Sequence, residues 1–410
     1  MPTERFHAAL SSELDALRQR GTLKGDETVI TRVLPAEGER GPRYLLAGEG
    51  DQPFLKMNSN NYLGMALRPE LVHAEEAASR SFGVGPGAVR FISGTYQAHV
   101  DLEARLAAFH GRESAMIFSS AYASVLGALV PLATPETVLI SDELNHNCII
   151  NALRLARPKD KQIYKHLDMA DLETKLAAAA GTCRRAIVVT DGIFSMRGDH
   201  APLPDILALA RRYDERFPEN VVVVVDDSHG VGAFGRTGRG VEEHTGSGPV
   251  DVLVATLGKA LGVNGGYVTG SRTLTDFLRE TAPTYIYSNP ITVGECAAAL
   301  TAVDLLDSPE GLHLLAHLRA MTARFEQGLL RLGYETIPGE HPVVPLMVHD
   351  TAKTTALVAH LRRHGILATG LKYPVVPRGD ESIRFQVSAD HTPHDIDSVL
   401  AVLESFPGRS

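Results

Sequence analysis

Apolar runs of strand length alternate with helical patterns through the middle of this 410-residue chain. The runs are continuous and do not alternate with period two, which is typical of strands buried on both faces of a parallel sheet. Apolar residues between them recur at helical spacing, as in segments 102–109, 171–180 and 203–213. The pattern therefore predicts an α/β domain with a mostly parallel sheet covered by helices on both faces. The predicted strands are 114–118, 137–141, 185–190, 221–225, 250–255 and 266–269.

The pattern changes after about residue 290, where long helical stretches and short strands follow one another without regular alternation. This change predicts a second, smaller α+β domain in the C-terminal part of the chain. Its predicted helices are 294–306, 312–332, 354–363 and 393–406, and its predicted strands are 343–348, 366–369 and 382–387.

The N-terminal segment has a third pattern. Apolar residues at helical spacing predict an amphipathic helix over residues 4–20. Short apolar runs broken by Gly and Pro follow between residues 29 and 56, as in an arm rather than a domain. The expected organisation is an N-terminal helix and arm (1–59), a large domain (60–292) and a small C-terminal domain (293–410).

Composition and charge exclude several classes of protein. The net charge of −9 argues against a surface that binds nucleic acid or anionic membranes. Cys148, Cys183 and Cys296 lie far apart without a C-x-x-C pattern, which excludes a disulfide framework and a cysteine-based zinc site. We expect no metal. The sequence has neither a signal-peptide core nor an apolar run of membrane-spanning length, so the expected location is the cytoplasm.

A lysine and an aspartate follow two of the predicted strands and indicate a specific chemistry. Lys259 lies among small and apolar residues after strand 250–255, and Asp226 ends the run 221–225. A partly desolvated lysine can lose its proton near neutral pH, and a neutral amine forms a Schiff base with an aldehyde. A carboxylate is the partner that a protonated pyridine nitrogen requires. Alone, either residue fits an ordinary helix-start lysine or strand-end carboxylate, but together they point to a site for pyridoxal phosphate (PLP).

Other strand ends carry polar residues that fit the same site. The small residues Ser120 to Tyr122 enter a helix whose free N–H groups can bind a phosphate. The imidazole of His146 can stack on a flat heterocycle, and Ser195 can contact a cofactor. His229 lies three residues after Asp226, so both can face one point. Each has an ordinary alternative as a serine N-cap, a loop histidine or a turn residue.

Arg384 lies inside the apolar strand predicted over 382–387 of the small domain. A guanidinium held in a strand suits bidentate capture of a carboxylate. The alternative is an edge-strand arginine paired with a local acid such as Glu381 or Asp390.

A set of ordered motifs covers nearly the whole chain and resembles one known family. The motifs are NNYLG (60–64), VRFISGT (89–95), SDELNH (141–146), TDGIFSM (190–196), VDDSHGVG (225–232), TLGKALG (256–262), YSNP (287–290) and the tail PVVPRG (374–379) with IRFQVSA (383–389). The set resembles the α-oxoamine synthases, which are PLP enzymes of fold type I. The tail and the VRFISGT segment are most similar to the glycine C-acetyltransferases, also called 2-amino-3-ketobutyrate CoA ligases.

The resemblance implies a role for each candidate residue. Lys259 would form the Schiff base and then act as base and acid, while Asp226 would hold the proton on the pyridine nitrogen. His146 would stack on the ring, and the family pattern gives the remaining contacts. His229 and Ser195 would lie near the phenolic oxygen of the PLP ring. Ser120, Ala121, Tyr122 and Thr256 would bind the PLP phosphate, and Ser288 would reach the same phosphate from a partner subunit. Asn60 and Arg384 would bind the carboxylate of the amino-acid substrate.

The resemblance further implies a homodimer with shared active sites that condenses an amino acid, most simply glycine, with an acyl thioester on CoA or a carrier protein. The product is an α-amino-β-keto acid or, after decarboxylation, an α-aminoketone. Two alternatives remain at this point. One is another fold type I PLP enzyme such as an aminotransferase, and the other is a non-catalytic binding protein with the same fold.

Overall fold

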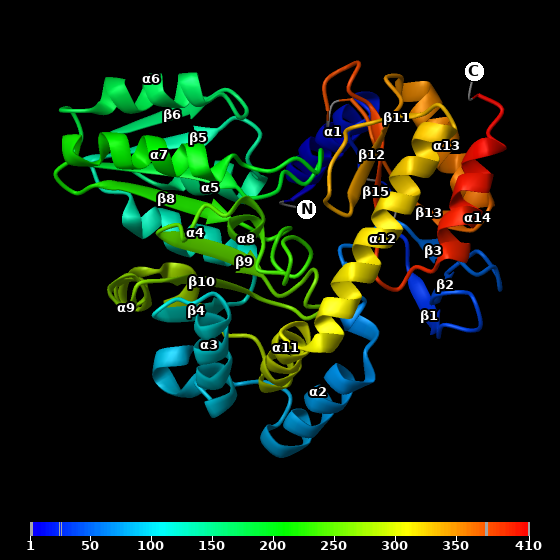
Figure 1. Ribbon diagram of the computed structural model, residues 1–410, viewed down its shortest axis with the longest axis horizontal. Helices are drawn as coiled ribbons and strands as arrows, with labels where there is room; N and C mark the ends of the chain where they lie inside the picture. Colours follow the sequence, from blue (N-terminus) through cyan, green and yellow to red (C-terminus); the bar gives the residue numbers. More distant parts are fainter. Residues whose placement is uncertain (1–2, 24, 26, 374–375, 409–410) are drawn as a thin grey trace.

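The computed structural model describes residues 3–23, 25, 27–373 and 376–408, and Figure 1 shows a large sheet domain beside a smaller helical and sheet domain. Pro374 and Val375, which open the predicted tail motif, lie outside the described residues. Within the described part of the chain, no helix is both long and apolar enough to cross a bilayer.

The large domain is built on a seven-stranded sheet with the order β4-β10-β9-β8-β7-β5-β6. Only β10 runs antiparallel to its neighbours β4 and β9, so the prediction of a mostly parallel sheet is confirmed. The strands are β4 (Ser114–Phe118), β5 (Thr137–Asp142), β6 (Asp160–Tyr164), β7 (Arg185–Asp191), β8 (Val221–Asp226), β9 (Val252–Thr256) and β10 (Gly266–Gly270).

Helices cover both faces of this sheet, as predicted. Side chains at alternate positions of β7 show the two faces, because Val188 packs with α6 and α7 whereas Val189 packs with α4 and α5. One face carries α6 (Met169–Ala179), α7 (Leu203–Tyr213) and α8 (Val241–Thr245), and the other carries α4 (Ala121–Leu132), α5 (Asn147–Leu155), α9 (Arg272–Thr281) and α10 (Pro283–Ile286).

The strand β6 was not predicted. Its residues Asp160 and Lys161 are exposed and polar, and only Tyr164 is buried, so the segment has no apolar run. It pairs with β5 alone and forms one edge of the sheet, where polar side chains remain in solvent.

The small domain contains a four-stranded antiparallel sheet with the order β11-β12-β15-β14. The predicted strand 366–369 is wrong in one respect, because the chain there changes sheets and forms two short strands, β13 and β14. The elements are β11 (Glu335–Thr336), β12 (Val343–Met347), β13 (Ile366–Leu367), β14 (Thr369–Leu371), β15 (Ser382–Gln386), α12 (Pro309–Arg331), α13 (Thr351–Arg363) and α14 (Pro393–Glu404).

One apolar core joins the two domains. It includes Ile117 and Tyr267 of the large sheet together with Phe325 of α12 and Phe385 of β15. In Figure 1, α12 runs along the boundary between the domains. The other elements near this boundary are α2 (Pro69–Phe82), α3 (Gln97–Phe109), α11 (Val293–Leu306) and the short helical turns Met65–Leu67 and Arg90–Gly94. A third short helical turn, Asp214–Arg216, directly follows α7 in the large domain.

The predicted N-terminal helix is α1 (Glu4–Gln19), but none of its residues is buried, and Phe6 is 61% exposed. The arm that follows forms a hairpin of β1 (Ile30–Leu34) with β2 (Arg43–Leu46). Its last strand, β3 (Leu55–Lys56), pairs in parallel with β13 of the small domain. The arm therefore packs against the C-terminal part of the chain.

Candidate active site

Residues from five segments of the large domain meet in one pocket at the carboxyl ends of its parallel strands, where ligands bind in sheets of this kind. The pocket contains seven of the residues predicted from the sequence, namely Ala121, Tyr122, His146, Ser195, Asp226, His229 and Lys259. Cys148, Asp191, Ile193 and Ser228 complete its wall.

Lys259 lies in the loop between β9 and β10. The amide of Leu257 donates to the carbonyl of Gly265 at 3.0 Å and closes this loop. Gly262 has φ +71°, and a Cβ on it would lie 2.4 Å from the amide nitrogen of Ala66, so the loop packs directly on the two residues that follow the NNYLG segment. No helix starts at Lys259, so the helix-start alternative is wrong. Burial lowers the pKa of Lys259, which favours the neutral amine that a Schiff base requires.

Asp226 is the last residue of β8, as expected, and is 7% exposed. Its Oδ1 accepts hydrogen bonds from the amide and the hydroxyl of Ser228, at 3.1 and 2.5 Å. Among the described residues, its Oδ2 accepts only from the thiol of Cys148, at 3.5 Å. A carboxylate fixed in this way keeps acceptor capacity for a protonated ring nitrogen.

The imidazole of His229 is held in place by Tyr62. The Tyr62 hydroxyl lies 2.8 Å from Nδ1 of His229 and 3.3 Å from Oδ1 of Asn60, which also accepts from the side chain of Gln386. Burial lowers the pKa of His229 well below its ordinary value and raises the pKa of Tyr62. The contact with the Tyr62 hydroxyl fixes the orientation of the neutral imidazole, and Nε2 of His229 has no hydrogen bond to any described residue, so it is available to a ligand.

His146 caps α5 through its own side chain. Its Nδ1 accepts from the amide of Cys148 at 3.3 Å, and its backbone N–H donates to Oδ2 of Asp191 at 3.0 Å. Desolvation by its neighbours lowers the pKa of His146, although the residue as a whole stays exposed. The neutral, flat ring is thus fixed at the mouth of the pocket, where stacking on a heterocycle is possible.

The N-terminus of α4 provides a phosphate cradle. The Ser120 hydroxyl accepts from the amide of Ala123 at 3.1 Å, so Ser120 is the N-cap. The first-turn amides of Ala121 and Tyr122 have no partner within the helix. A Cβ on Gly266 would lie 2.2 Å from the amide nitrogen of Ala121, so only glycine lets this end of α4 approach β10. Free amides at a helix N-terminus favour an anion.

Five predicted residues do not line the pocket of this single chain, and one of them is Ser120, the N-cap just described. Arg384 reaches it indirectly, because its guanidinium donates to the carbonyl of Ser195 at 3.0 Å. Asn60 connects to His229 through Tyr62, as described above. The Thr256 hydroxyl donates to the carbonyl of Gly265 and accepts from the amide of Gly258. Ser288 contacts only its neighbour Asn289 among the described residues.

The ordinary alternative for Arg384 is wrong. The strand β15 lies between β12 and β14 and is not an edge. Among the described residues Arg384 forms no ion pair, and its buried Nε has no hydrogen-bond partner. The carboxylate of Glu381 accepts instead from Thr351 and Gly379. A partly buried guanidinium without an acid is available for a carboxylate ligand.

Sequence reasoning missed several residues that hold the site together, namely Tyr62, Cys148, Asp191, Ser228 and Gln386. Of these, Asp191 was the easiest to predict from the sequence, because it ends an apolar strand just as Asp226 does. Tyr62 and Gln386 lie within motifs already noted, but their contacts join segments more than 150 residues apart, with separations of 167 for Tyr62–His229 and 326 for Gln386–Asn60.

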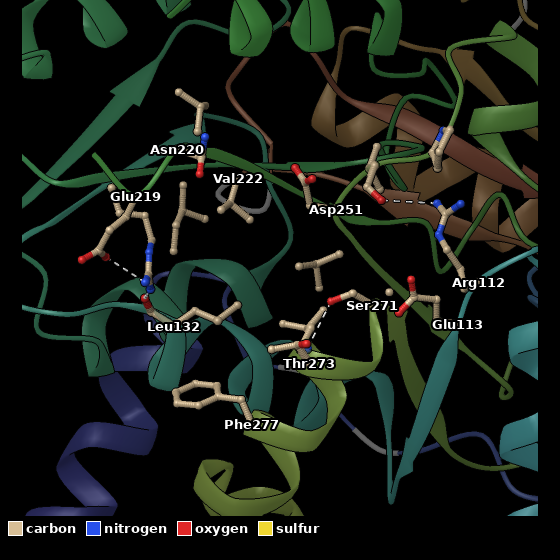
Figure 2. A pocket seen from close by; sticks show the side chains of 18 of the residues that line it. Arg112, Glu113, Leu132, Glu219, Asn220, Val222, Asp251, Ser271, Thr273 and Phe277 are labelled. Atoms are coloured by element: carbon tan, nitrogen blue, oxygen red, sulfur yellow. Dashed lines mark hydrogen bonds and ion pairs between the residues drawn. The ribbon is translucent and has the colours of Figure 1, made fainter. Parts of the chain in front are cut away.

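A larger open cleft of about 870 Å³ lies elsewhere, at the amino ends of β8 and β9. Figure 2 shows some of its lining residues, among them Arg112, Asp251 and Phe277. Val221 and Val252, the first residues of β8 and β9, also line it, so it lies at the end of the sheet opposite the pocket. It contains none of the predicted site residues. No group of His, Cys, Asp or Glu in the described ranges could hold a metal ion.

Comparisons with known proteins identify the family of the chain. Residues 52–403 match the family described as aminotransferase class I and II. The chain is 38% identical to 8-amino-7-oxononanoate synthase 1 of Bacillus velezensis, covering 97% of this chain and 96% of the relative. It is 39% identical to the mitochondrial 2-amino-3-ketobutyrate coenzyme A ligase of Homo sapiens, covering 96% and 90%.

A solved structure gives the same result in three dimensions. Serine palmitoyltransferase from S. paucimobilis, solved with a bound PLP–myriocin adduct, is 25% identical, with a TM-score of 0.85 over 97% of this chain and 96% of that one. The fold is therefore that of fold type I PLP enzymes, as expected. The chain belongs to the α-oxoamine synthases, a group of PLP-dependent acyltransferases within the aminotransferase class I and II family.

Proposed function

We propose that this α-oxoamine synthase condenses glycine with an acyl-CoA thioester and releases the free thiol. The observation that carries the proposal is the convergence of Lys259, Asp226 and Arg384 on one region. The first two line the pocket, and the third reaches it through Ser195. An amine, a carboxylate and a guanidinium are the groups needed to move a proton, hold a ring cation and bind a carboxylate.

The residues present fit PLP. The cradle at α4 is open only because Gly266 lacks a side chain, and Oδ1 of Asp191 is a buried pocket atom without a partner. Asp226, Lys259 and the amides of Ala121 and Tyr122 would hold the ring nitrogen, the aldehyde carbon and the phosphate. When bound, PLP supplies the electron sink for negative charge at the α-carbon of the amino acid.

The side chains of this chain divide the remaining work. Arg384 orients the substrate carboxylate, so that the α-C–H bond lies near Lys259. The neutral amine of Lys259 takes the α-proton at Nζ and can return it later. Nε2 of His229, on a ring oriented by Tyr62, forms a hydrogen bond with an oxygen in the pocket. A new bond then forms between the α-carbon and the thioester carbonyl carbon, the C–S bond breaks, and the sulfur leaves as the thiol.

Glycine is supported by the resemblance of the tail and the VRFISGT segment to glycine C-acetyltransferases, and by the similarity to a 2-amino-3-ketobutyrate coenzyme A ligase. The 8-amino-7-oxononanoate synthases are almost equally similar. The test is a matrix of glycine, alanine and serine against acyl-CoAs of increasing length, scored by thiol release. We expect kcat/KM for glycine to be at least about tenfold higher, since one extra carbon in a tight pocket costs 10- to 200-fold. A similar preference for alanine or serine would contradict the assignment.

Replacing Arg384 with alanine should raise the KM for the amino acid by about 30- to 1000-fold. Loss of one partner of a buried charged contact costs about 2–4 kcal/mol, and each 1.4 kcal/mol is about tenfold. Arg384→Lys, which keeps the charge but not the planar fork, should fall between wild type and Arg384→Ala. The KM for acyl-CoA serves as the internal control and should change little. An unchanged amino-acid KM in Arg384→Ala would remove this residue from the substrate site.

We also propose that the enzyme is a homodimer in which Ser288 of one subunit contacts the phosphate in its partner. Several exposed apolar side chains support a second copy, among them Phe6 of α1, Ile92 at 65% exposure and Tyr287 at 78%. Tyr287 directly precedes Ser288, so the segment proposed to reach the partner carries an exposed aromatic ring. A carrier-protein donor and a cytoplasmic location remain predictions from the sequence.

A further inference from the structure

The pocket contains a second buried carboxyl group that the proposed chemistry does not use. Asp191 ends β7 as Asp226 ends β8, and the two residues are register partners in neighbouring parallel strands. Both side chains project toward the α4 and α5 face, because Val189 and Val224, two positions earlier, pack on that face. Both residues line the pocket, and they are only 4% and 7% exposed.

Two carboxylates in this position cannot both carry a charge at low cost. Asp226 accepts from three donors, which are the amide and hydroxyl of Ser228 and the thiol of Cys148. Asp191 accepts from one, the amide of His146, through Oδ2. Its Oδ1 is buried without any partner in the described part of the chain. Hydrogen bonds to an ionised carboxylate favour it, so the negative charge belongs on Asp226.

The surroundings of Asp191 favour the same distribution. Burial and then the neighbouring charge of Asp226 raise the pKa of Asp191 well above its ordinary value. The titratable groups around it are Asp226, Cys148, His146, Lys259 and Tyr164 of β6, with Asp142 of β5 further away. Of these only Lys259 can carry a positive charge deep in the pocket, and burial lowers its pKa. The charge of Lys259 acts in the opposite direction and lowers the pKa of Asp191, but burial and the charge of Asp226 outweigh it.

We infer that Asp191 is a positioning residue held as the neutral acid, with its proton on Oδ1 and its Oδ2 fixing the backbone of His146. The pair Asp191–Asp226 then carries a single negative charge, which matches the single positive charge of a protonated pyridine ring. The neutral acid also turns the unpartnered Oδ1 into a donor directed at the pocket or at Asp226. The inference depends on the PLP site and not on the choice of glycine as substrate.

Asp191→Asn tests this inference, since an amide keeps the shape, one acceptor and one donor but can carry no charge. We expect its Kd for PLP, measured by titration of the apoprotein, to stay within about threefold of wild type. Asp191→Ala should bind PLP at least about tenfold more weakly, because it loses the acceptor for His146 and the donor at Oδ1. Asp226→Asn is the matched control and should weaken binding by at least about 100-fold.

A direct readout of the proton keeps the inference falsifiable if Asp191→Ala does not fold. The infrared difference spectrum of wild-type minus Asp191→Asn holoenzyme at pH 7 should contain the C=O band of a protonated carboxylic acid. A difference band of an ionised carboxylate would overturn the inference, as would a loss of PLP affinity in Asp191→Asn comparable with that in Asp226→Asn. Wild-type affinity in a folded Asp191→Ala would show that Asp191 positions nothing. None of these outcomes depends on which amino acid the enzyme accepts.

Discussion

Replacing Lys259 with alanine is expected to lower kcat by at least about 10⁴-fold, the upper end of what a positioned acid or base contributes. The loss should be this large because the variant lacks both the amine that binds the cofactor aldehyde and the group that moves the α-proton. Treatment of the wild type with PLP and borohydride should attach the cofactor covalently to Lys259. Mass spectrometry of the peptide containing residue 259 measures this, and the variant should carry no adduct there.

Lys56→Ala provides a matched control. Lys56 is another partly buried lysine whose pKa is lowered by desolvation, but it lies in β3, outside the pocket, over the ring of Tyr44 at 4.9 Å. This variant should keep the kcat of the wild type and the adduct at Lys259. If Lys259→Ala retained more than a few per cent of activity, or if the adduct formed at another lysine, the role of Lys259 would be wrong.

Replacing Asp226 with alanine or asparagine should reduce kcat/KM by roughly 10²- to 4 × 10³-fold, and by more if proton transfer becomes limiting. Removing one partner of a buried charge pair costs about 3–5 kcal/mol, because the other charge remains without compensation. PLP should still bind weakly, since the cradle at α4 and Lys259 remain intact. Steady-state kinetics and a PLP titration measure the two effects separately.

Asp251→Asn is the control for Asp226. Asp251 is an exposed acid beside the same central strands, but it lines the distant cleft and accepts from the amide of Val223 at 2.7 Å. Asparagine can keep that acceptor, so kcat/KM should not change. A loss in Asp251→Asn equal to that in Asp226→Asn would indicate a general effect of weakening the sheet. That result would contradict the proposed role of Asp226 at the ring nitrogen of PLP.

The sequence predicted the buried strands of the large domain well, because strands covered on both faces have continuous apolar runs. The edge strand β6 escaped because its side chains face solvent, so its residues Asp160 and Lys161 resemble a loop. The reversed direction of β10 also could not be read from the sequence. That direction depends on the loop 257–265, which is too short for the crossover helix that a parallel connection needs.

Some residues of the active site could likewise be predicted from the sequence, and others could not. Lys259 and Asp226 could be found from the sequence because each follows an apolar strand, which places it at the ligand-binding end of a parallel sheet. The pairing of Asp191 with Asp226 could not be found from the sequence, because it depends on β7 and β8 being neighbouring strands in register. Tyr62 was equally hidden, because its contact with His229 spans 167 residues. Ser288 lies outside the pocket of its own chain, so one chain alone cannot test its predicted contact.

The central claim is that the enzyme joins an amino acid to an acyl thioester. The most direct test mixes the purified protein with PLP, glycine and an acyl-CoA and follows free thiol together with the mass of the product. The account predicts that thiol is released only when both substrates are present, with one equivalent of the acylated amino acid or its decarboxylated ketone. Transfer of the amino group to an added keto acid without thiol release would contradict the account and indicate an aminotransferase, and no turnover at all in protein carrying PLP on Lys259 would contradict it as well.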